Sequence, residues 1–75
     1  MVMSMELNRI LSKRLRELRK SSGYTLKSVA NYLGVVYQTY QSYELGVNLP
    51  SINNLVKLAD LFDVSTDYLL GRTEF

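Results

Sequence analysis

Uncharged polar side chains gather on one side of a short predicted helix near the middle of the chain. At about 100° per residue, Gln38, Gln41 and Ser42 fall together, without a Lys or Glu among them. A helix side that only faces water usually carries charged residues, so a merely solvated polar surface is the less favoured alternative. A Gln amide can pair with the edge of adenine in the major groove, and a Ser hydroxyl can donate or accept there. These residue types therefore indicate hydrogen bonding to bases.

Two short helices joined by a tight turn would position these side chains. The first is predicted over 26–33, after Thr25 as N-cap. Its apolar residues share one helical face: Val29, Ala30 and Leu33. Gly34 suits the left-handed position that ends a helix, and the second helix follows over 36–44. Because Ala30 is small, the two helices can cross closely, and the stretch predicts a helix-turn-helix.

The remaining helices would form the scaffold around this unit. They are predicted over 6–21, 52–62 and 66–70. The helix over 52–62 is apolar over more than half its circumference, so we expect it to be buried on most sides. The sequence thus predicts an all-α, compact five-helix domain over 6–71, between a frayed start at 1–5 and a tail at 72–75.

The composition argues against several classes of protein. The 75 residues allow one domain, and a hydrophobic content of 47% is sufficient for a small core. No apolar run approaches the roughly 20 residues that cross a bilayer, and Glu6 and Arg9 interrupt any signal-peptide pattern. The chain has no Cys and no His, no Gly-rich phosphate loop and no pair of carboxylates in a plausible pocket. We therefore expect a soluble cytoplasmic protein that is not an enzyme and uses no metal and no cofactor.

The charges are distributed unevenly along the chain. The nine basic and seven acidic residues give a net charge of +2. Seven of the nine basic residues lie within the first 27 positions: Arg9, Lys13, Arg14, Arg16, Arg19, Lys20 and Lys27. This layout suits a protein that presents one end to an anion such as DNA phosphate. For four of them, an ordinary solvated face of the first helix is the favoured interpretation, and contact with DNA phosphates is the alternative: Arg9, Lys13, Arg16 and Lys20.

In order and type, these features resemble the Cro/phage-repressor type of helix-turn-helix, the XRE family. The resemblance extends over about 11–71 and is carried by LSKRLRELRKSSGYTLKSVANYLGV, TYQSYELGVNLPS and LVKLADLFDVSTDYLLG. Its marks are Ala30, Gly34, Y-E-x-G at 43–46, Pro50 and D-Y-L-L-G at 67–71. The resemblance implies a lambda-repressor-like fold and a sequence-specific transcriptional regulator of double-stranded DNA. Such proteins usually repress as homodimers on palindromic operators, here with the helix at 36–45 in the major groove.

The same resemblance implies roles for individual residues. Base-contacting positions fall on Tyr37, Gln38, Gln41 and Ser42. Phosphate-contacting positions fall on Arg14, Arg19, Thr25, Leu26, Lys27, Thr39 and Asn48. An ion pair between Arg19 and Glu44 would join the first helix to the helix at 36–45, which is called the recognition helix below. Leu26 and Val36 depart from the family, which commonly has Gln and a capping Ser or Thr at these positions.

The sequence leaves the protein partners open. Apolar candidates for a dimer surface lie near the end of the chain: Tyr68, Leu69, Leu70 and Phe75. Packing of Tyr68 and Leu69 inside the domain is an equal alternative. Apolar residues also surround the recognition helix: Val36, Leu45, Val47 and Leu49. They would suit a protein partner such as an antirepressor or a toxin, so a protein-interaction module is the second functional hypothesis.

Overall fold

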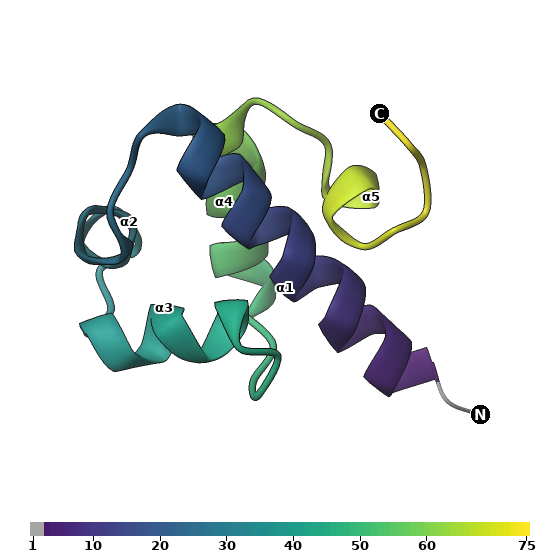
Figure 1. Ribbon diagram of the computed structural model, residues 1–75, viewed down its shortest axis with the longest axis horizontal. Helices are drawn as coiled ribbons and strands as arrows, with labels where there is room; N and C mark the ends of the chain where they lie inside the picture. The colour runs from purple at the N-terminus through teal and green to yellow at the C-terminus, as the bar shows by residue number, and fades with distance from the viewer. Residues whose placement is uncertain (1–2) are drawn as a thin grey trace.

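The longest helix, at the start of the chain, forms the platform for the others. The computed structural model describes residues 3–75, which form five helices and no strand (Figure 1). The helices are α1 Met3–Ser22, α2 Leu26–Leu33, α3 Tyr37–Glu44, α4 Ile52–Phe62 and α5 Thr66–Leu69. α1 packs against α3, α4 and α5, and α2 packs against α3 and α4. The predicted all-α fold is confirmed.

The helix ends follow local sequence signals. α2 and α4 have the predicted bounds, whereas α1 begins at Met3, before the expected start at residue 6. Of the expected frayed start at 1–5, residues 1–2 lie outside the described part of the chain. Val36 is the N-cap of α3, with extended backbone at φ −73° and ψ 157° and no side-chain capping bond. A valine side chain has no acceptor for the exposed N–H groups of the first turn, so the helix begins at Tyr37 without side-chain help.

The helix-turn-helix is defined by caps at both ends of α2. Thr25 Oγ1 accepts from the Ser28 N–H at 3.0 Å, and Ser28 Oγ accepts from the Thr25 N–H at 3.0 Å. This reciprocal pair is a capping box, which satisfies two backbone donors at the helix start. At the other end Gly34 has φ 76°, a left-handed conformation that glycine adopts without a steric penalty. The chain therefore changes direction between α2 and α3 for local reasons, and the two helices cross steeply (Figure 1).

Every helix contributes side chains to the core. Its most completely buried side chains are Leu11, Leu15, Val29, Tyr40, Leu58 and Leu69. Because each helix supplies at least one of them, no helix can leave the bundle without exposing apolar surface. The core consequently fixes α2 and α3 relative to α1.

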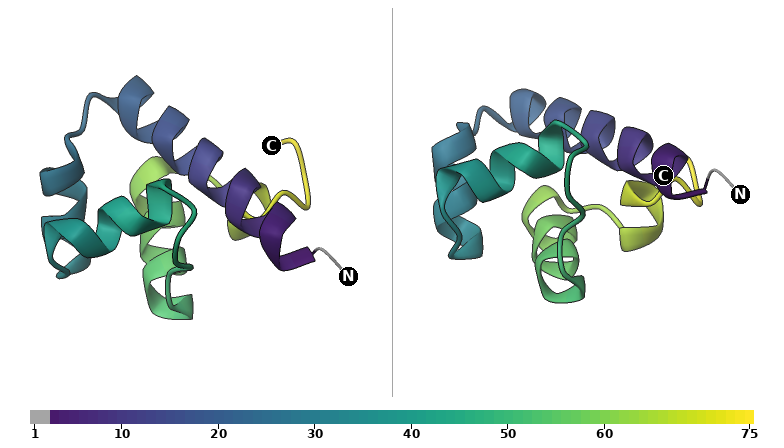
Figure 2. Two further views of the ribbon diagram at one scale, coloured as in Figure 1. Left: turned by 60° about the horizontal axis from the view of Figure 1, so that its bottom comes forward. Right: turned by 90° about the horizontal axis from the view of Figure 1, so that it is seen from below.

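The prediction that α4 is buried on most sides is wrong. Its residues Leu58, Ala59 and Phe62 face the core. Ile52, however, is 81% exposed, and Val56 one turn later is exposed as well. Figure 2 shows why: the end of α4 that follows the loop after α3 extends away from α1, beyond its neighbours. The apolar residues of α4 cover more of its circumference than the other helices can bury.

Gly71 is a position where both backbone and space require glycine. Its φ is +80°, and a Cβ there would lie 2.9 Å from Ile10 Cδ1 and Ile10 Cγ2. Gly23 has φ +76°, but a Cβ there would meet nothing within 4 Å. Either alanine would carry the left-handed cost of about 1–2 kcal/mol. Gly71→Ala must also displace the stiff β-branched Ile10.

We therefore expect Gly71→Ala to lower the free energy of unfolding by about 1 kcal/mol more than Gly23→Ala does. Urea unfolding of the two variants, followed by circular dichroism, measures the difference. Equal losses in the two variants would show that Ile10 does not restrict position 71.

Candidate nucleic-acid interface

The side of α3 that faces away from the core carries the residues predicted to contact bases. The side chains accessible to water on this side are Tyr37, Gln38, Gln41 and Ser42. The buried residues on the opposite side are Tyr40, Tyr43 and Glu44. The predicted division of the helix is thus present from Tyr37 onward. Val36 precedes the helix as its N-cap and is 65% exposed.

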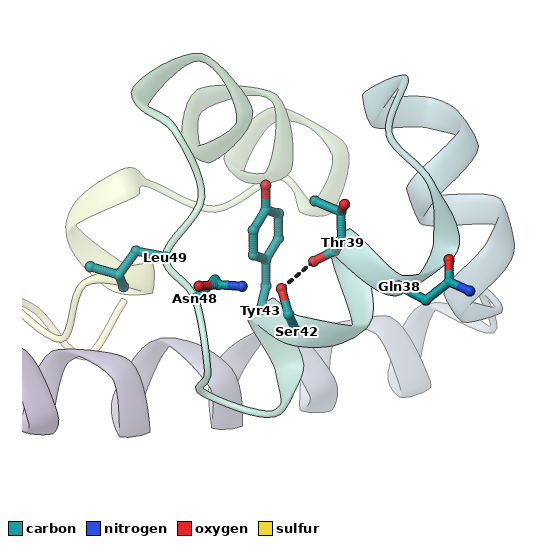
Figure 3. A pocket seen from close by; sticks show the side chains of 6 residues that line it. All are labelled: Gln38, Thr39, Ser42, Tyr43, Asn48 and Leu49. Atoms are coloured by element: carbon teal, nitrogen blue, oxygen red, sulfur yellow. Dashed lines mark hydrogen bonds between the residues drawn. The ribbon is translucent and has the colours of Figure 1, made fainter.

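A hollow lies between α3 and the loop that follows it (Figure 3). Its volume is about 360 Å³, and its lining residues are Gln38, Thr39, Ser42, Tyr43, Asn48 and Leu49. The structure therefore brings together four residues predicted to contact DNA with two that were not, Tyr43 and Leu49. The hollow combines amide and hydroxyl groups with an aromatic ring and one aliphatic side chain.

The hydroxyl of Ser42 has a defined hydrogen-bonding role in this hollow. Ser42 Oγ donates to the Thr39 carbonyl oxygen at 2.6 Å, as drawn in Figure 3. A hydroxyl has a single hydrogen, so the oxygen is left as an acceptor. In the major groove such an acceptor matches the amino groups of adenine and cytosine.

The start of α2 presents backbone N–H donors, whereas α3 presents side-chain groups. The backbone N–H groups of Leu26 and Lys27 have no acceptor within residues 3–75, as expected for the first turn of a helix. The Lys27 side chain is exposed, whereas Leu26 is half-buried and packs on the core. Leu26 can therefore offer only its backbone. The Thr25 hydroxyl already accepts from Ser28 in the capping box. A helix start with an exposed lysine is suited to a phosphate group.

Arg19 and Glu44 form a bidentate ion pair between α1 and the last residue of α3. Arg19 Nε lies 2.7 Å from Glu44 Oε2, and Arg19 Nη2 donates to Glu44 Oε1 at 3.0 Å. The side chains are only 14% and 5% exposed. The third nitrogen, Nη1, donates to the Tyr24 carbonyl oxygen at 3.1 Å. The hydrogen bond with Glu44 raises the pKa of Arg19, and its effect exceeds the lowering caused by burial.

Removing Arg19 would leave the Glu44 carboxylate buried without its partner. We expect Arg19→Ala to lower the free energy of unfolding by about 3–5 kcal/mol. Arg72→Ala is the matched control, because Arg72 and Asp67 are 4.0 Å apart and 74% and 64% exposed, and exposed pairs contribute about 0–1 kcal/mol. Urea unfolding compares the variants. Similar losses for both arginines would contradict a stabilising buried pair.

Tyr40 lies beside this pair with its phenol in the core. The side chain is fully buried, and Oη has no hydrogen-bond partner among the residues that the structure describes. Burial of the phenol, together with the nearby Glu44 carboxylate, raises the pKa of Tyr40 well above the ordinary tyrosine value. The folded state therefore holds this proton more tightly than the unfolded state does.

This difference predicts alkaline destabilisation. The stability due to the neutral phenol is fully present below the unfolded tyrosine pKa of about 10 and is lost as the pH rises above it. Tyr40→Phe should stay within about 1 kcal/mol of the wild type at pH 7, because the ring is kept and no hydrogen bond is lost. It should lose less stability than the wild type between about pH 9 and 11. Urea unfolding across this range tests the prediction, with the exposed Tyr32→Phe as control; parallel losses in the wild type and Tyr40→Phe would refute it.

Arg14 makes its contacts with the C-terminal segment. Its guanidinium donates to the Tyr68 carbonyl oxygen and, at 2.9 Å, to the Thr73 carbonyl oxygen. It also lies 4.2 Å from the centre of the Tyr68 ring and 3.6 Å from Glu74 Oε1. The donors of Arg14 are thus turned toward the C-terminal segment. These contacts give Arg14 a structural role, and its phosphate contact stays a prediction.

The proposed C-terminal dimer residues differ in accessibility. Leu69 is wholly inside the core, so it cannot contact a second copy of the folded domain, and its prediction is corrected. Tyr68 and Leu70 are half-buried, and Arg14 covers the ring of Tyr68. Phe75 is 91% exposed. Burial of Leu69 follows from the position of α5, which packs on α1 and α4.

A contact near the end of α3 was not expected from the sequence. Asn8 Nδ2 donates to the Gly46 carbonyl oxygen at 3.1 Å and so joins α1 to the loop after α3. Arg9, Ser12 and Leu45 border the same shallow groove of about 280 Å³. Arg9 is therefore a cation close to the recognition helix. The sequence gives only a weak signal for this contact: Asn8 falls on the same side of the first helix as Ser12 and Arg19.

Comparison with known proteins identifies the family. A family model described as helix-turn-helix matches residues 15–69. The chain belongs to the XRE-type helix-turn-helix family. The Ala30 and Gly34 marks and the ion pair of Arg19 with Glu44 all lie inside the matched region.

Three curated relatives are named as transcriptional regulators or repressors. The HTH-type transcriptional regulator AnsR of Bacillus subtilis is 49% identical over 59 residues, which cover 79% of this chain and 51% of AnsR. ImmR of the same organism is 44% identical over 64 residues, covering 85% of this chain and 50% of ImmR. The cryptic phage CTXphi transcriptional repressor RstR of Vibrio cholerae is 39% identical over 62 residues, covering 83% of this chain and 55% of RstR. The chain spans about half the length of these relatives.

A solved structure shares the fold. The hypothetical transcription factor NHTF from Neisseria superposes with a TM-score of 0.78 at 21% sequence identity. The match covers 89% of this chain and 77% of that chain. In residues 3–75, every helix is either too short or too polar to span a membrane.

Proposed function

We propose that this domain binds double-stranded DNA of a defined sequence and regulates transcription, most simply as a repressor. The observation that carries the proposal is the uncharged outward side of α3, with Gln38 exposed and Ser42 left as an acceptor. Amide and hydroxyl groups on the outward side of a helix match the base edges of the major groove. The similarity to regulators and to a phage repressor supports the same function.

The interface has separate parts for specificity and for affinity. Tyr37, Gln38, Gln41 and Ser42 contact bases in this proposal, while Thr39 and Asn48 at the hollow reach the backbone. The start of α2, with Lys27, holds a phosphate and sets the height of α3 over the groove. Arg9 adds a positive charge near the other end of α3. Phosphate contacts of this kind attract any DNA, and only the base contacts discriminate between sequences.

A palindromic operator with one copy of the domain on each half-site completes the proposal. Two-fold related recognition helices must then lie about 34 Å apart to enter successive major grooves on one face of the duplex. The name of RstR as a transcriptional repressor supports the regulatory outcome. In this proposal the protein acts in the cytoplasm, where bacterial DNA lies.

Selection of bound duplexes from a random pool, followed by two variants, tests the function. Gln38→Ala should weaken binding to the selected site by about 1–3 kcal/mol and relax the preference at one base pair. Lys27→Ala should weaken binding to all sequences about equally and reduce the salt dependence by about one phosphate contact. Arg72→Ala is a control for loss of a surface cation, since Arg72 lies near the chain end beside Asp67. Titrations measured by fluorescence anisotropy at two salt concentrations separate these outcomes; a uniform loss in Gln38→Ala would contradict a base contact.

A protein-interaction module is the second candidate. The exposure of four apolar residues around α3 favours it: Val36, Leu45, Val47 and Leu49. A titration with random-sequence duplex DNA at low salt separates the candidates. Absence of any binding would reject the DNA-binding proposal and favour a protein ligand.

A further inference from the structure

Four cations form a row along the outer side of α1. They recur at the spacing of one helical face, and all of them are exposed: Arg9, Lys13, Arg16 and Lys20. At about 100° per residue they fall on the side of α1 opposite the core residues Leu11 and Leu15. At 1.5 Å per residue the row extends about 16 Å from its first member to its last. This α1 row is therefore a continuous strip of positive charge.

The positive charge of the α1 row is accessible from outside the molecule. The ion pairs of the described side chains involve Arg14, Arg19 and Arg72, and none of these pairs includes a member of the row. Glu17 is an exposed acid of α1, but it lies beside the row and not within it. Figure 1 shows α1 in front of α4, and none of the helices in the described part of the chain covers its outer side. An anion can therefore approach the whole row.

The α1 row faces a different direction from the recognition helix. On one flank of α1, Asn8 and Ser12 border the loop after α3. On the other flank, Arg14 holds the C-terminal segment. The row lies between these flanks, and only Arg9 at its end also borders the groove next to α3. In Figure 1 α3 lies below α1, and in the right view of Figure 2 the outer side of α1 forms the top of the molecule. A straight duplex bound on α3 therefore leaves the rest of the row uncovered.

The composition of the row favours nucleic acid as its partner. From residue 9 to residue 20, the outer side of α1 carries only polar and charged side chains. The centre of a protein–protein interface is usually depleted in charged residues and enriched in aromatic ones, so this surface does not match a protein partner. A straight row of positive charge matches a duplex, which carries one negative charge per about 1.7 Å of its axis. Both charge and shape therefore fit the DNA backbone.

We propose that the α1 row binds a second segment of double-stranded DNA while α3 is bound to the first, so that one domain bridges two duplexes. The inference rests on the proposed function and adds a second surface with its ligand. Lys13, Arg16 and Lys20 reach only phosphates in this arrangement, so the second segment needs no particular sequence.

The number of cations predicts a weak contact that depends strongly on salt. Three cations neutralise about three phosphates, which gives a slope of about −2.7 for the logarithm of affinity against the logarithm of salt concentration. Between 50 and 200 mM salt, the affinity for the second segment should thus fall about 40-fold. A weak contact becomes significant when both segments belong to one DNA molecule, because the tether raises the effective concentration to about the millimolar range.

A capture assay tests the proposal. A duplex carrying the selected site is attached to beads, the protein is bound to it, and a labelled duplex of random sequence is added. Wild-type protein should retain the labelled duplex at 50 mM salt and about 40-fold less of it, per bound protein, at 200 mM. The double variant Lys13→Gln with Arg16→Gln should retain about tenfold less at 50 mM, because two phosphate contacts are lost. It should bind the duplex on the beads like the wild type.

The matched control removes the same charge outside the row. Lys57→Gln with Arg72→Gln changes two exposed cations, on α4 and after α5, and should retain the labelled duplex like the wild type. Circular dichroism verifies that both double variants are folded. Absence of retention by the wild type would overturn the proposal. Equal retention by the two double variants would also overturn it, because bridging would then arise from copies that contact each other.

A measurement on the free protein separates this proposal from the proposed function. Amide resonances are recorded during titration with a short random-sequence duplex and, separately, with poly-L-glutamate at equal charge concentration. With the duplex, shifts along the α1 row but none in α3 would reject DNA binding by α3 and retain the row as a DNA surface. Shifts confined to α2 and α3 would reject the row. Larger shifts of the row with poly-L-glutamate than with the duplex would overturn DNA as its partner in favour of an acidic protein.

Discussion

The buried ion pair between Arg19 and Glu44 determines how α3 is positioned relative to α1. An isolated helix of eight residues is not stable in water, so α3 depends on contacts with the rest of the domain. The pair attaches its last residue to α1 through two hydrogen bonds of 2.7 and 3.0 Å. The bond from Asn8 to Gly46 fixes the chain just beyond it. At the other end, Gly34 and the capped α2 define where α3 begins.

With both ends fixed, the two sides of α3 have separate tasks. Tyr40 and Tyr43 fill the core, with their rings in an edge-to-face arrangement at 6.0 Å. The outward side of α3 lies outside the core and carries only neutral polar groups. Such a surface provides little electrostatic attraction by itself. In the proposed complex, affinity therefore comes from Lys27, the start of α2 and cations on α1, while α3 supplies discrimination between sequences.

Two arginines of α1 make long-range contacts, and through them α1 holds two different parts of the molecule. Arg19 holds the recognition helix, and Arg14 holds the segment after α5 through Tyr68 and Thr73. Neither guanidinium is left unpaired in the described structure. α4, by contrast, packs on one side only and leaves Ile52 and Val56 uncovered. The domain is therefore closely packed around α1, and apolar side chains stay exposed at the start of α4.

The helices, the turn and the two sides of α3 could be predicted from the sequence, apart from the first residues of α1, because they depend on local chemistry: apolar spacing, hydroxyl caps and a glycine at positive φ. The motif also indicated the ion pair of Arg19 with Glu44. Which apolar and charged side chains are covered could not be predicted, because this depends on how the helices pack together. Leu69 and Ile52 are both apolar, yet one is wholly buried and the other 81% exposed. Arg14 and Lys27 are both cations, yet only Lys27 remains exposed. These outcomes depend on which neighbouring helix covers each face, and helical periodicity within one segment does not contain that information.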